Sequence, residues 1–550
     1  MTKYDYIVIG AGSAGCVVAN RLTEDQQTTV LLLEAGNSDT KPEIQIPAEC
    51  VNLLGSEVDW GYFSEPEPYL SDRQIFCSRG KVLGGSSSIN FMTYIRGNPR
   101  DYDRWQELGN PGWSYQNVLP YFKKSEHQQR DACEFHGVDG EMSVSDLIAP
   151  TAISQRFIDA AMALGYDYNP DFNAKQQEGT GRYQFTIKDG KRHSAAAAFL
   201  VPILQRPNLT VTTEVLVTRL LFEKTRAVGV EYLHQGKLHQ VKVNREVILS
   251  AGAFDSPKLL MLSGIGDAAH LQAMGISVVV DLLGVGQNLQ DHIHATVVYQ
   301  ATQDLHFAST SGIGEAGLFL HSEGNSVYAP DLQFFFAPIQ LLPPGYTPSV
   351  FGFTGVISLN RLQNTGSVWL RSPDPKDAPM FRMNYLQNEA DVQKLVAAIK
   401  LMRQLFQSIA FDEFRGEEIA PGFYVTSDEA LIAYIRNTAS TMWHPVGTCK
   451  MGTDSMAVVD PELRVNGVEG LRVVDASIMP TITTGNTNAP TIMIGEKAAD
   501  LIKASHSRQT LMTKYNVKNL AHLGYLGNGD WAKPTDAPPG ANPLGLRDRD

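Results

Sequence analysis

The chain has 550 residues, of which 43% are hydrophobic and 19% charged, a composition typical of a large globular protein of two domains or one elaborated unit. The net charge of -13 excludes a main partner with a phosphate backbone, since nucleic-acid binding needs a basic surface. No run of about 18 apolar residues is present, so the sequence predicts no transmembrane helix.

The first predicted elements are a strand, a tight turn and a helix. Residues 6–9 are apolar and run into Gly10, Gly12 and Gly15, in the pattern Gly-x-Gly-x-x-Gly. In this pattern the first glycine permits the turn, the second lets the backbone approach a pyrophosphate, and the third allows close helix–strand packing. Because the N-terminus enters this strand without a charged leader and cleavage site, we expect a cytoplasmic protein.

A second apolar strand, residues 29–33, ends at Glu34. An acidic residue about 20 positions past the glycines is placed to accept hydrogen bonds from ribose hydroxyls. The sequence therefore predicts a dinucleotide site, the alternative being a glycine-rich structural turn. A glutamate here disfavours NADP, but it does not separate NAD from FAD.

Cysteines and histidines give no sign of a structural metal or a disulfide framework. The five cysteines are odd in number, scattered and without C-x-x-C spacing, so we expect reduced thiols. His292 and His294 are close together but have no cysteine or carboxylate cluster around them, so we predict turn or core roles and no metal site.

Two further glycine- and serine-rich stretches occupy residues 79–90 and 247–266. The first contains Gly84-Gly85-Ser86-Ser87-Ser88, whose small side chains suit a loop that presses its backbone against phosphates or a planar ring. The second reads as a strand, a turn and a helix, with Pro257 in the first helical turn.

These two stretches resemble the signatures of the glucose–methanol–choline oxidoreductases, and the resemblance runs in order to about Lys503. It implies FAD as the cofactor and an elaborated α/β fold. In that fold a Rossmann-like FAD-binding domain is joined to a discontinuous substrate-binding domain built on an antiparallel sheet. We expect residues 1–150, 208–298 and 446–504 in the first domain and 151–207 and 299–445 in the second. Residues 505–550 are expected to form an irregular extension of unknown role.

Carried over position by position, the resemblance implies FAD contacts from the first glycine-rich region, from the two later glycine- and serine-rich stretches, and from three further places: Val217, residues 475–476 and Asn486. The predicted cofactor-binding residues are Gly10, Gly12, Ser13, Ala14, Gly15, Glu34, Ala35, Val82, Gly84, Gly85, Ser86, Asn90, Val217, Ala251, Gly252, Asp475, Ala476 and Asn486. Some family members attach FAD covalently through a histidine in the Gly-Gly-Ser-Ser loop. The corresponding position is Ile89, which has no nucleophile, so we predict noncovalent FAD.

The resemblance implies a catalytic pair, His444 and Asn486. A histidine with an ordinary pKa near 6.5 can take the hydroxyl proton of an alcohol, and a neutral amide can orient the substrate oxygen. Pro445 disfavours helix after the histidine, so His444 is expected at a strand or loop end. Asn488 is the alternative to Asn486. We predict oxidation of a primary alcohol to an aldehyde.

The sequence leaves several alternatives open. A lyase on the same fold can keep the histidine, whereas light-driven fatty-acid decarboxylases of the family lack it; a silent flavin-binding module is a third reading. Oxygen and a quinone are both possible electron acceptors, and a quinone would place the protein at the membrane periphery. The oligomeric state and the particular alcohol are not specified.

The substrate-binding segment carries two expectations of its own. Phe334, Phe335 and Phe336 should alternate between the faces of a strand, so that some of them belong to the core. Residues 391–402 have the apolar spacing of an amphipathic helix.

Overall fold

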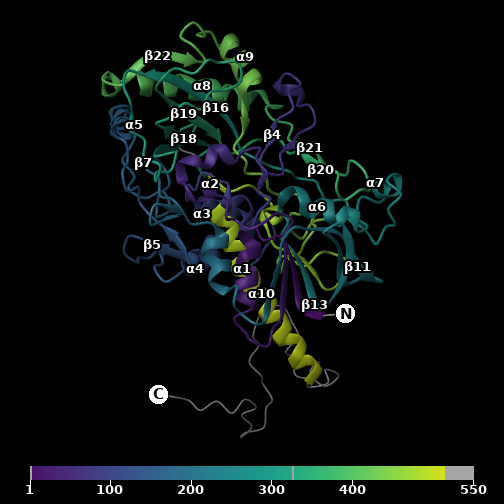
Figure 1. The fold of residues 1–550 in the computed structure, drawn as a ribbon. Coiled ribbons are helices and arrows are strands. Elements are labelled where there is room, and N and C mark those ends of the chain that lie inside the picture. Colours follow the sequence, from purple (N-terminus) through teal and green to yellow (C-terminus); the bar gives the residue numbers. More distant parts are fainter. Residues whose placement is uncertain (1–2, 325–327, 515–550) are drawn as a thin grey trace, which may run out of the picture. The chain divides into compact units, whose positions relative to one another are not determined.

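The computed structural model describes residues 3–324 and 328–514 (Figure 1). The described residues up to 499 belong to one compact unit, and residues 500–514 belong to a second. Most of the expected C-terminal extension, residues 515–550, lies outside the described residues. None of the helices in the described part of the chain is long and apolar enough to cross a membrane. The five cysteines are all free thiols, as expected.

The first of two large sheets has seven strands in the order β10-β2-β1-β13-β12-β11, with β24 also paired to β13. Its strands are β1 (Lys3–Ile9), β2 (Val30–Leu33), β10 (Leu209–Thr212), β11 (Val215–Glu223), β12 (Arg226–His234), β13 (Lys237–Leu249) and β24 (Leu471–Val473). The strands β10, β2, β1, β13 and β24 pair in parallel, and β11, β12 and β13 pair antiparallel. Helix α1 (Ser13–Leu22) follows β1, which confirms the predicted strand, turn and helix.

The apolar runs of the sequence explain the parallel part of this sheet. Strands covered on both faces are apolar throughout, and β2 is buried along its whole length. Ile9 pairs with Leu33 on one side and with Leu249 on the other. The carboxyl ends of three strands therefore meet at one edge, and this edge is where the chain leaves β1 at Gly10, β2 at Glu34 and β13 at Ser250.

The second large sheet is antiparallel, in the order β22-β16-β19-β18-β17-β7, with β23 paired to β16. Its strands are β7 (Gly179–Arg182), β16 (Ile293–Ala301), β17 (Ala316–Leu320), β18 (Leu332–Ala337), β19 (Gly352–Leu359), β22 (Arg415–Ala420) and β23 (Ser440–Thr441). This confirms the antiparallel sheet expected for a substrate-binding domain. The boundary expected at residue 298 falls within β16, so we propose that this domain resumes near residue 292.

Helix α8 (Glu389–Gln407) packs against β16 and β19, as Figure 1 shows. It contains the predicted helix 391–402 and buries a stripe of apolar residues against the sheet. Phe334 and Phe336 point into this core, whereas Phe335 points to the opposite face and lines a cavity. The alternation expected for a strand is therefore confirmed.

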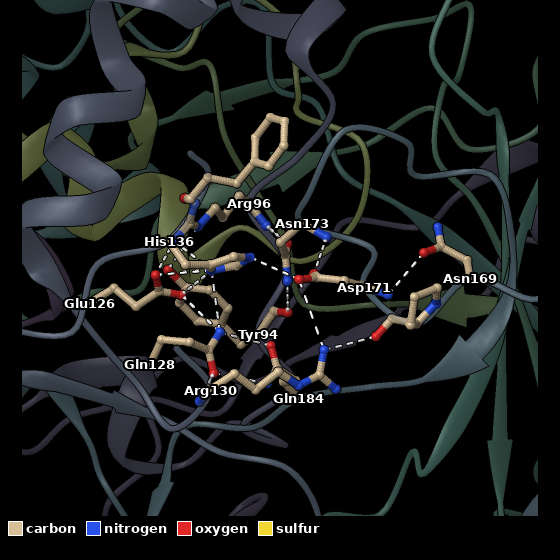
Figure 2. Close-up of polar contacts among 12 residues, drawn as sticks. Tyr94, Arg96, Glu126, Gln128, Arg130, His136, Asn169, Asp171, Asn173 and Gln184 are labelled. Atoms are coloured by element: carbon tan, nitrogen blue, oxygen red, sulfur yellow. Dashed lines mark hydrogen bonds and ion pairs between the residues drawn. The ribbon is translucent and has the colours of Figure 1, made fainter. Parts of the chain in front are cut away.

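A buried polar network joins the short strand β5 (Glu126–Gln128) to the loops next to β7 of the second sheet (Figure 2). His136 lies between two carboxylates, with Nδ1 at 3.0 Å from Glu126 and Nε2 at 2.8 Å from Asp171. Glu126 also forms an ion pair with Arg96, at 2.5 Å. Burial alone would lower the pKa of His136, but the hydrogen bonds that the ring donates to Asp171 and Glu126 outweigh this effect and raise the pKa to about 9.

We expect His136→Gln to lower the melting temperature near pH 6 by roughly 2–4 °C, because both carboxylates lose a charged partner. The folded-state pKa is raised, so the contribution is fully present below the unfolded value near 6.5 and is lost as the pH rises through about 9. Thermal melts of wild type and variant at pH 6, 7.5 and 9.5 measure this.

The control for that experiment is His127→Gln, because His127 is exposed and adjacent to the network. It should leave the melting temperature unchanged at each pH. A loss in His136→Gln that stays constant from pH 6 to 9.5 would contradict a charged His136.

Candidate active site

The glycine turn after β1 forms one wall of a cavity of about 530 Å³. Gly10 has φ +95°, and a Cβ there would overlap the carbonyl of Ser250. A Cβ at Gly15 would overlap the carbonyl of Gly10, so Gly15 allows the helix to pack on the strand. Gly12 is not crowded in this way. A Cβ at Gly12 would be 4.0 Å from its nearest neighbour, the carbonyl oxygen of Ser250, and Gly12 lines the cavity.

Helix α1 begins at this wall without a side-chain cap and without an acidic residue in its first turn. Its first N–H groups and its dipole therefore favour an anion in the cavity. Gly85 of the second glycine-rich loop presses against Gly12, since a Cβ at Gly85 would lie 2.8 Å from the Cα of Gly12. Gly252 has φ +85°, and a Cβ there would meet nothing within 4 Å. Gly12 and Gly252 therefore leave room for a bound group to approach the backbone closely.

Two buried carboxylates hold the turns in the half of the cavity that the glycine turns line, which is called the nucleotide half below. Glu34 accepts hydrogen bonds from the N–H groups of Ala11 and Gly36, each at 2.8 Å. Burial raises the pKa of Glu34 to about 7, although these backbone hydrogen bonds oppose it. Asp475 accepts from Gly252 N at 2.9 Å and from Ser256 Oγ at 2.6 Å. Both acids thus order the backbone at the cavity wall, and the ribose contact of Glu34 stays a prediction.

The cavity brings together most of the predicted site residues from distant parts of the chain. Its lining includes Gly10, Gly12, Ser13, Ala14, Glu34, Ala35, Gly85, Ser86, Asn90, Val217, Ala251, Gly252, His444, Asp475, Ala476 and Asn486. Three predicted residues do not line it. Gly15 packs on Gly10, Val82 belongs to a small apolar core cluster, and Gly84 donates its N–H to Ala11 O at 2.7 Å. Their support of the site is therefore indirect.

His444 lies where the second sheet meets the cavity, three residues past β23, as the following proline predicted. Asp291 positions its backbone: His444 N donates to Asp291 Oδ1 at 2.7 Å, and the hydroxyls of Thr441 and Tyr385 donate to Oδ2. Sequence reasoning missed Asp291, because its role depends on contacts with segments about 100 and 150 residues away.

The His444 ring has a partner on each nitrogen. Nδ1 is 2.9 Å from Nδ1 of His292, with the two rings perpendicular, and Nε2 is 3.4 Å from Nδ2 of Asn486. An amide N–H group can only donate, so Nε2 of His444 carries the lone pair and its proton sits on Nδ1. His292 then accepts at Nδ1 and carries its own proton on Nε2, a buried nitrogen that has no hydrogen-bond partner among the described residues.

The environment keeps His444 unprotonated. Burial lowers its pKa well below the ordinary value, and the neighbouring His292, Arg79 and His294 lower it further. The ordinary pKa near 6.5 assumed from the sequence is therefore wrong for this site. The physical reason is that the residue is only 8% exposed and its ring lies near the guanidinium of Arg79 and the imidazoles of His292 and His294.

The structure also separates the two asparagines. Asn488 accepts a hydrogen bond from Ser13 Oγ at 2.7 Å and so belongs to the glycine-turn side, whereas Asn486 lies beside His444. Within the described residues, no group of three or more His, Cys, Asp or Glu side chains could hold a metal ion. Further lining residues that the sequence did not single out are Trp60, Arg79 and Phe91.

The fold and the cavity define a dinucleotide-dependent oxidoreductase, and comparison with known proteins identifies its kind. Residues 4–294 and 363–495 match the N- and C-terminal domain models of the GMC oxidoreductases. The chain belongs to this family.

Three relatives indicate the range of activities in the neighbourhood of this chain. It is 45% identical to an oxygen-dependent choline dehydrogenase of Sinorhizobium fredii, over 90% of this chain and 95% of that one. It is 44% identical to an alcohol dehydrogenase [acceptor] of Pseudomonas putida, over 91% of this chain and 95% of that one. The structure of pyridoxine 4-oxidase from Mesorbium loti is 30% identical with a TM-score of 0.86, covering 90% of this chain and 99% of that one.

The protein is therefore an FAD-dependent oxidoreductase that acts on CH–OH groups. The cavity fits this cofactor: the uncapped helix and the open glycines would hold the pyrophosphate. The Ala251–Gly252 turn and Ala476 would line the rest of the cofactor.

We expect FAD to be bound without a covalent link, because the loop position used for attachment in some relatives is Ile89, which is buried and has no nucleophile. Precipitation of the holoprotein in acid should release all of the flavin to the supernatant, as judged by absorbance. Flavin that stays in the washed pellet would contradict this expectation.

Proposed function

We propose that the protein oxidises a primary alcohol to the aldehyde, with His444 as the base. The observation that supports this most is the position of the His444 ring, whose Nε2 lies at the cavity wall 3.4 Å from the amide nitrogen of Asn486. The hydroxyl proton passes to Nε2, the C–H hydride leaves from the carbon, and the C–O bond becomes a carbonyl. FAD, when bound, is the acceptor of that hydride.

The remaining residues position this base. Asn486 can donate from Nδ2 to the substrate oxygen and so hold it next to Nε2 of His444. His292 accepts the Nδ1 proton of His444, which keeps the lone pair on the cavity side. Asp291 holds the backbone of the His444 loop. The lowered pKa of His444 keeps the base form populated at and below neutral pH.

The acceptor that reoxidises the flavin is proposed to be oxygen or a quinone. The names of two relatives, an oxygen-dependent enzyme and one that uses an unspecified acceptor, cover both alternatives. Turnover under air, compared with turnover under nitrogen with a soluble quinone, distinguishes them. The cytoplasmic location stays a prediction from the sequence.

We expect His444→Ala to keep its FAD and to slow flavin reduction by roughly 10²–10⁴-fold, because general-base catalysis contributes about this much. Anaerobic stopped-flow spectroscopy with a panel of primary alcohols measures the rate, and the absorbance of the gel-filtered protein measures the FAD content. His306→Ala is the matched control, since that side chain is 87% exposed.

An unchanged reduction rate in His444→Ala would refute the base. If no alcohol of the panel bleaches the wild-type flavin, the proposed oxidation is wrong. A lyase, a light-driven decarboxylase or a silent flavin-binding module would then remain.

The contact between the rings of His292 and His444 gives a separate prediction for His292. His292→Leu removes the acceptor for the Nδ1 proton of His444 and should slow flavin reduction by about 10–100-fold without loss of FAD, the usual effect of removing a group that orients a histidine. His292→Asn offers an amide oxygen near the position of Nδ1 and should restore part of the rate. Equal rates in the Leu and Asn variants would show that the contact is only structural.

A further inference from the structure

Among the described residues, no acidic side chain lines the substrate half of the cavity, the part formed by His444 and the second sheet. We propose that the substrate is a neutral, largely apolar alcohol, not a cationic amino alcohol such as choline; this inference rests on the proposed function. The wall opposite the glycine turn is mainly apolar, with Ile313, Phe335, Leu341, Leu342, Val356 and Met442.

Every carboxylate that lines the cavity belongs to the nucleotide half and is already engaged. Glu34 accepts from two backbone N–H groups, and Asp475 accepts from Gly252 and Ser256. Asp255 accepts from the hydroxyl of Tyr62 at 2.9 Å. None of these acids is placed to neutralise a cation next to His444.

The charged side chain that lines the cavity beside His444 is itself a cation. Arg79 donates to the carbonyl of Trp443, the residue before His444, and its charge lowers the pKa of His444. A second cation in this part of the cavity would be repelled as well as desolvated. Burying an unpaired charge is far more costly than burying a neutral group of equal size.

The aromatic residues do not form a cage for a quaternary ammonium group. Phe91 and Trp443 pack edge to face, with ring centroids 5.6 Å apart. Phe335 has one face covered by Tyr183, with the centroids at 5.0 Å. Cation–π recognition needs exposed aromatic faces directed at one point, whereas these contacts take up one face of Phe335 and join Phe91 to Trp443 within the protein.

Apart from Arg79, the polar groups named in the substrate half are neutral. His294, Thr296, Thr438 and Ser440 line it, and burial lowers the pKa of His294 to about 4, so that its ring is uncharged. These groups can hydrogen-bond an uncharged substituent, but they offer no counter-ion. The wall thus suits an aliphatic or arylalkyl chain.

Choline and 3,3-dimethylbutan-1-ol test the inference directly, because they have the same shape and differ in charge. We expect the holoenzyme to show a kcat/KM at least about 100-fold higher for the neutral isostere, given the cost of an unpaired buried charge. Equal or higher kcat/KM for choline would overturn the inference. Flavin that neither compound nor any alcohol of the panel bleaches would instead refute the proposed function.

A matched pair of variants tests whether the lack of an acidic side chain causes the preference for the neutral compound. Met442 is a half-buried lining residue of similar length to Glu and Gln. Met442→Glu should narrow the gap between the isosteres at least about tenfold, as expected for a new ion pair in a desolvated site, while Met442→Gln should not. For each holoprotein, the compound with the higher kcat/KM should also raise the melting temperature more. An equal change in the two variants would show that charge is not what the pocket selects.

Discussion

The active site depends on one buried carboxylate, that of Asp291, which is not itself among the residues that line the cavity. Asp291 accepts hydrogen bonds from Tyr385, from Thr441 and from the backbone of His444, and so joins three segments of the chain at one point. Burial raises its pKa, and both these hydrogen-bond donors and the charge of Arg79 oppose the rise. The ring of His444 can lie between His292 and Asn486 only because its backbone is held in this way.

The two sheets divide the tasks of the molecule. The parallel strands of the first sheet end together, and the turns after β1, β2 and β13 form the glycine-lined half of the cavity. Their carboxylates satisfy backbone N–H groups, which keeps this half preorganised. The antiparallel sheet contributes the opposite wall through one face of β18 and β19 while its other face packs on the core. Acidic groups are therefore confined to the nucleotide half.

This division explains how relatives of similar identity can bear different names. The chain is about equally similar to an oxygen-dependent choline dehydrogenase and to an alcohol dehydrogenase [acceptor]. In the function proposed here, the glycine turns, His444 and Asn486 serve the oxidation itself, and the charge and shape of the opposite wall select the alcohol.

The sequence by itself determined the elements that have local causes. The glycine pattern around Gly10, the apolar runs of β1 and β2 and the alternation of Phe334 to Phe336 predicted the correct elements, because turn geometry and side-chain period act over a few residues. The family signatures named FAD and the pair His444 and Asn486.

Only the tertiary structure decided what surrounds these residues. It placed Val82 and Gly84 behind the cavity wall, assigned Asn488 to the turn and Asn486 to the base, and put His292 against His444. It also lowered the pKa of His444 through burial. The physical reason is that these properties arise from contacts between residues 40 to almost 500 positions apart. Desolvation and hydrogen-bond partners exist only once the chain has folded.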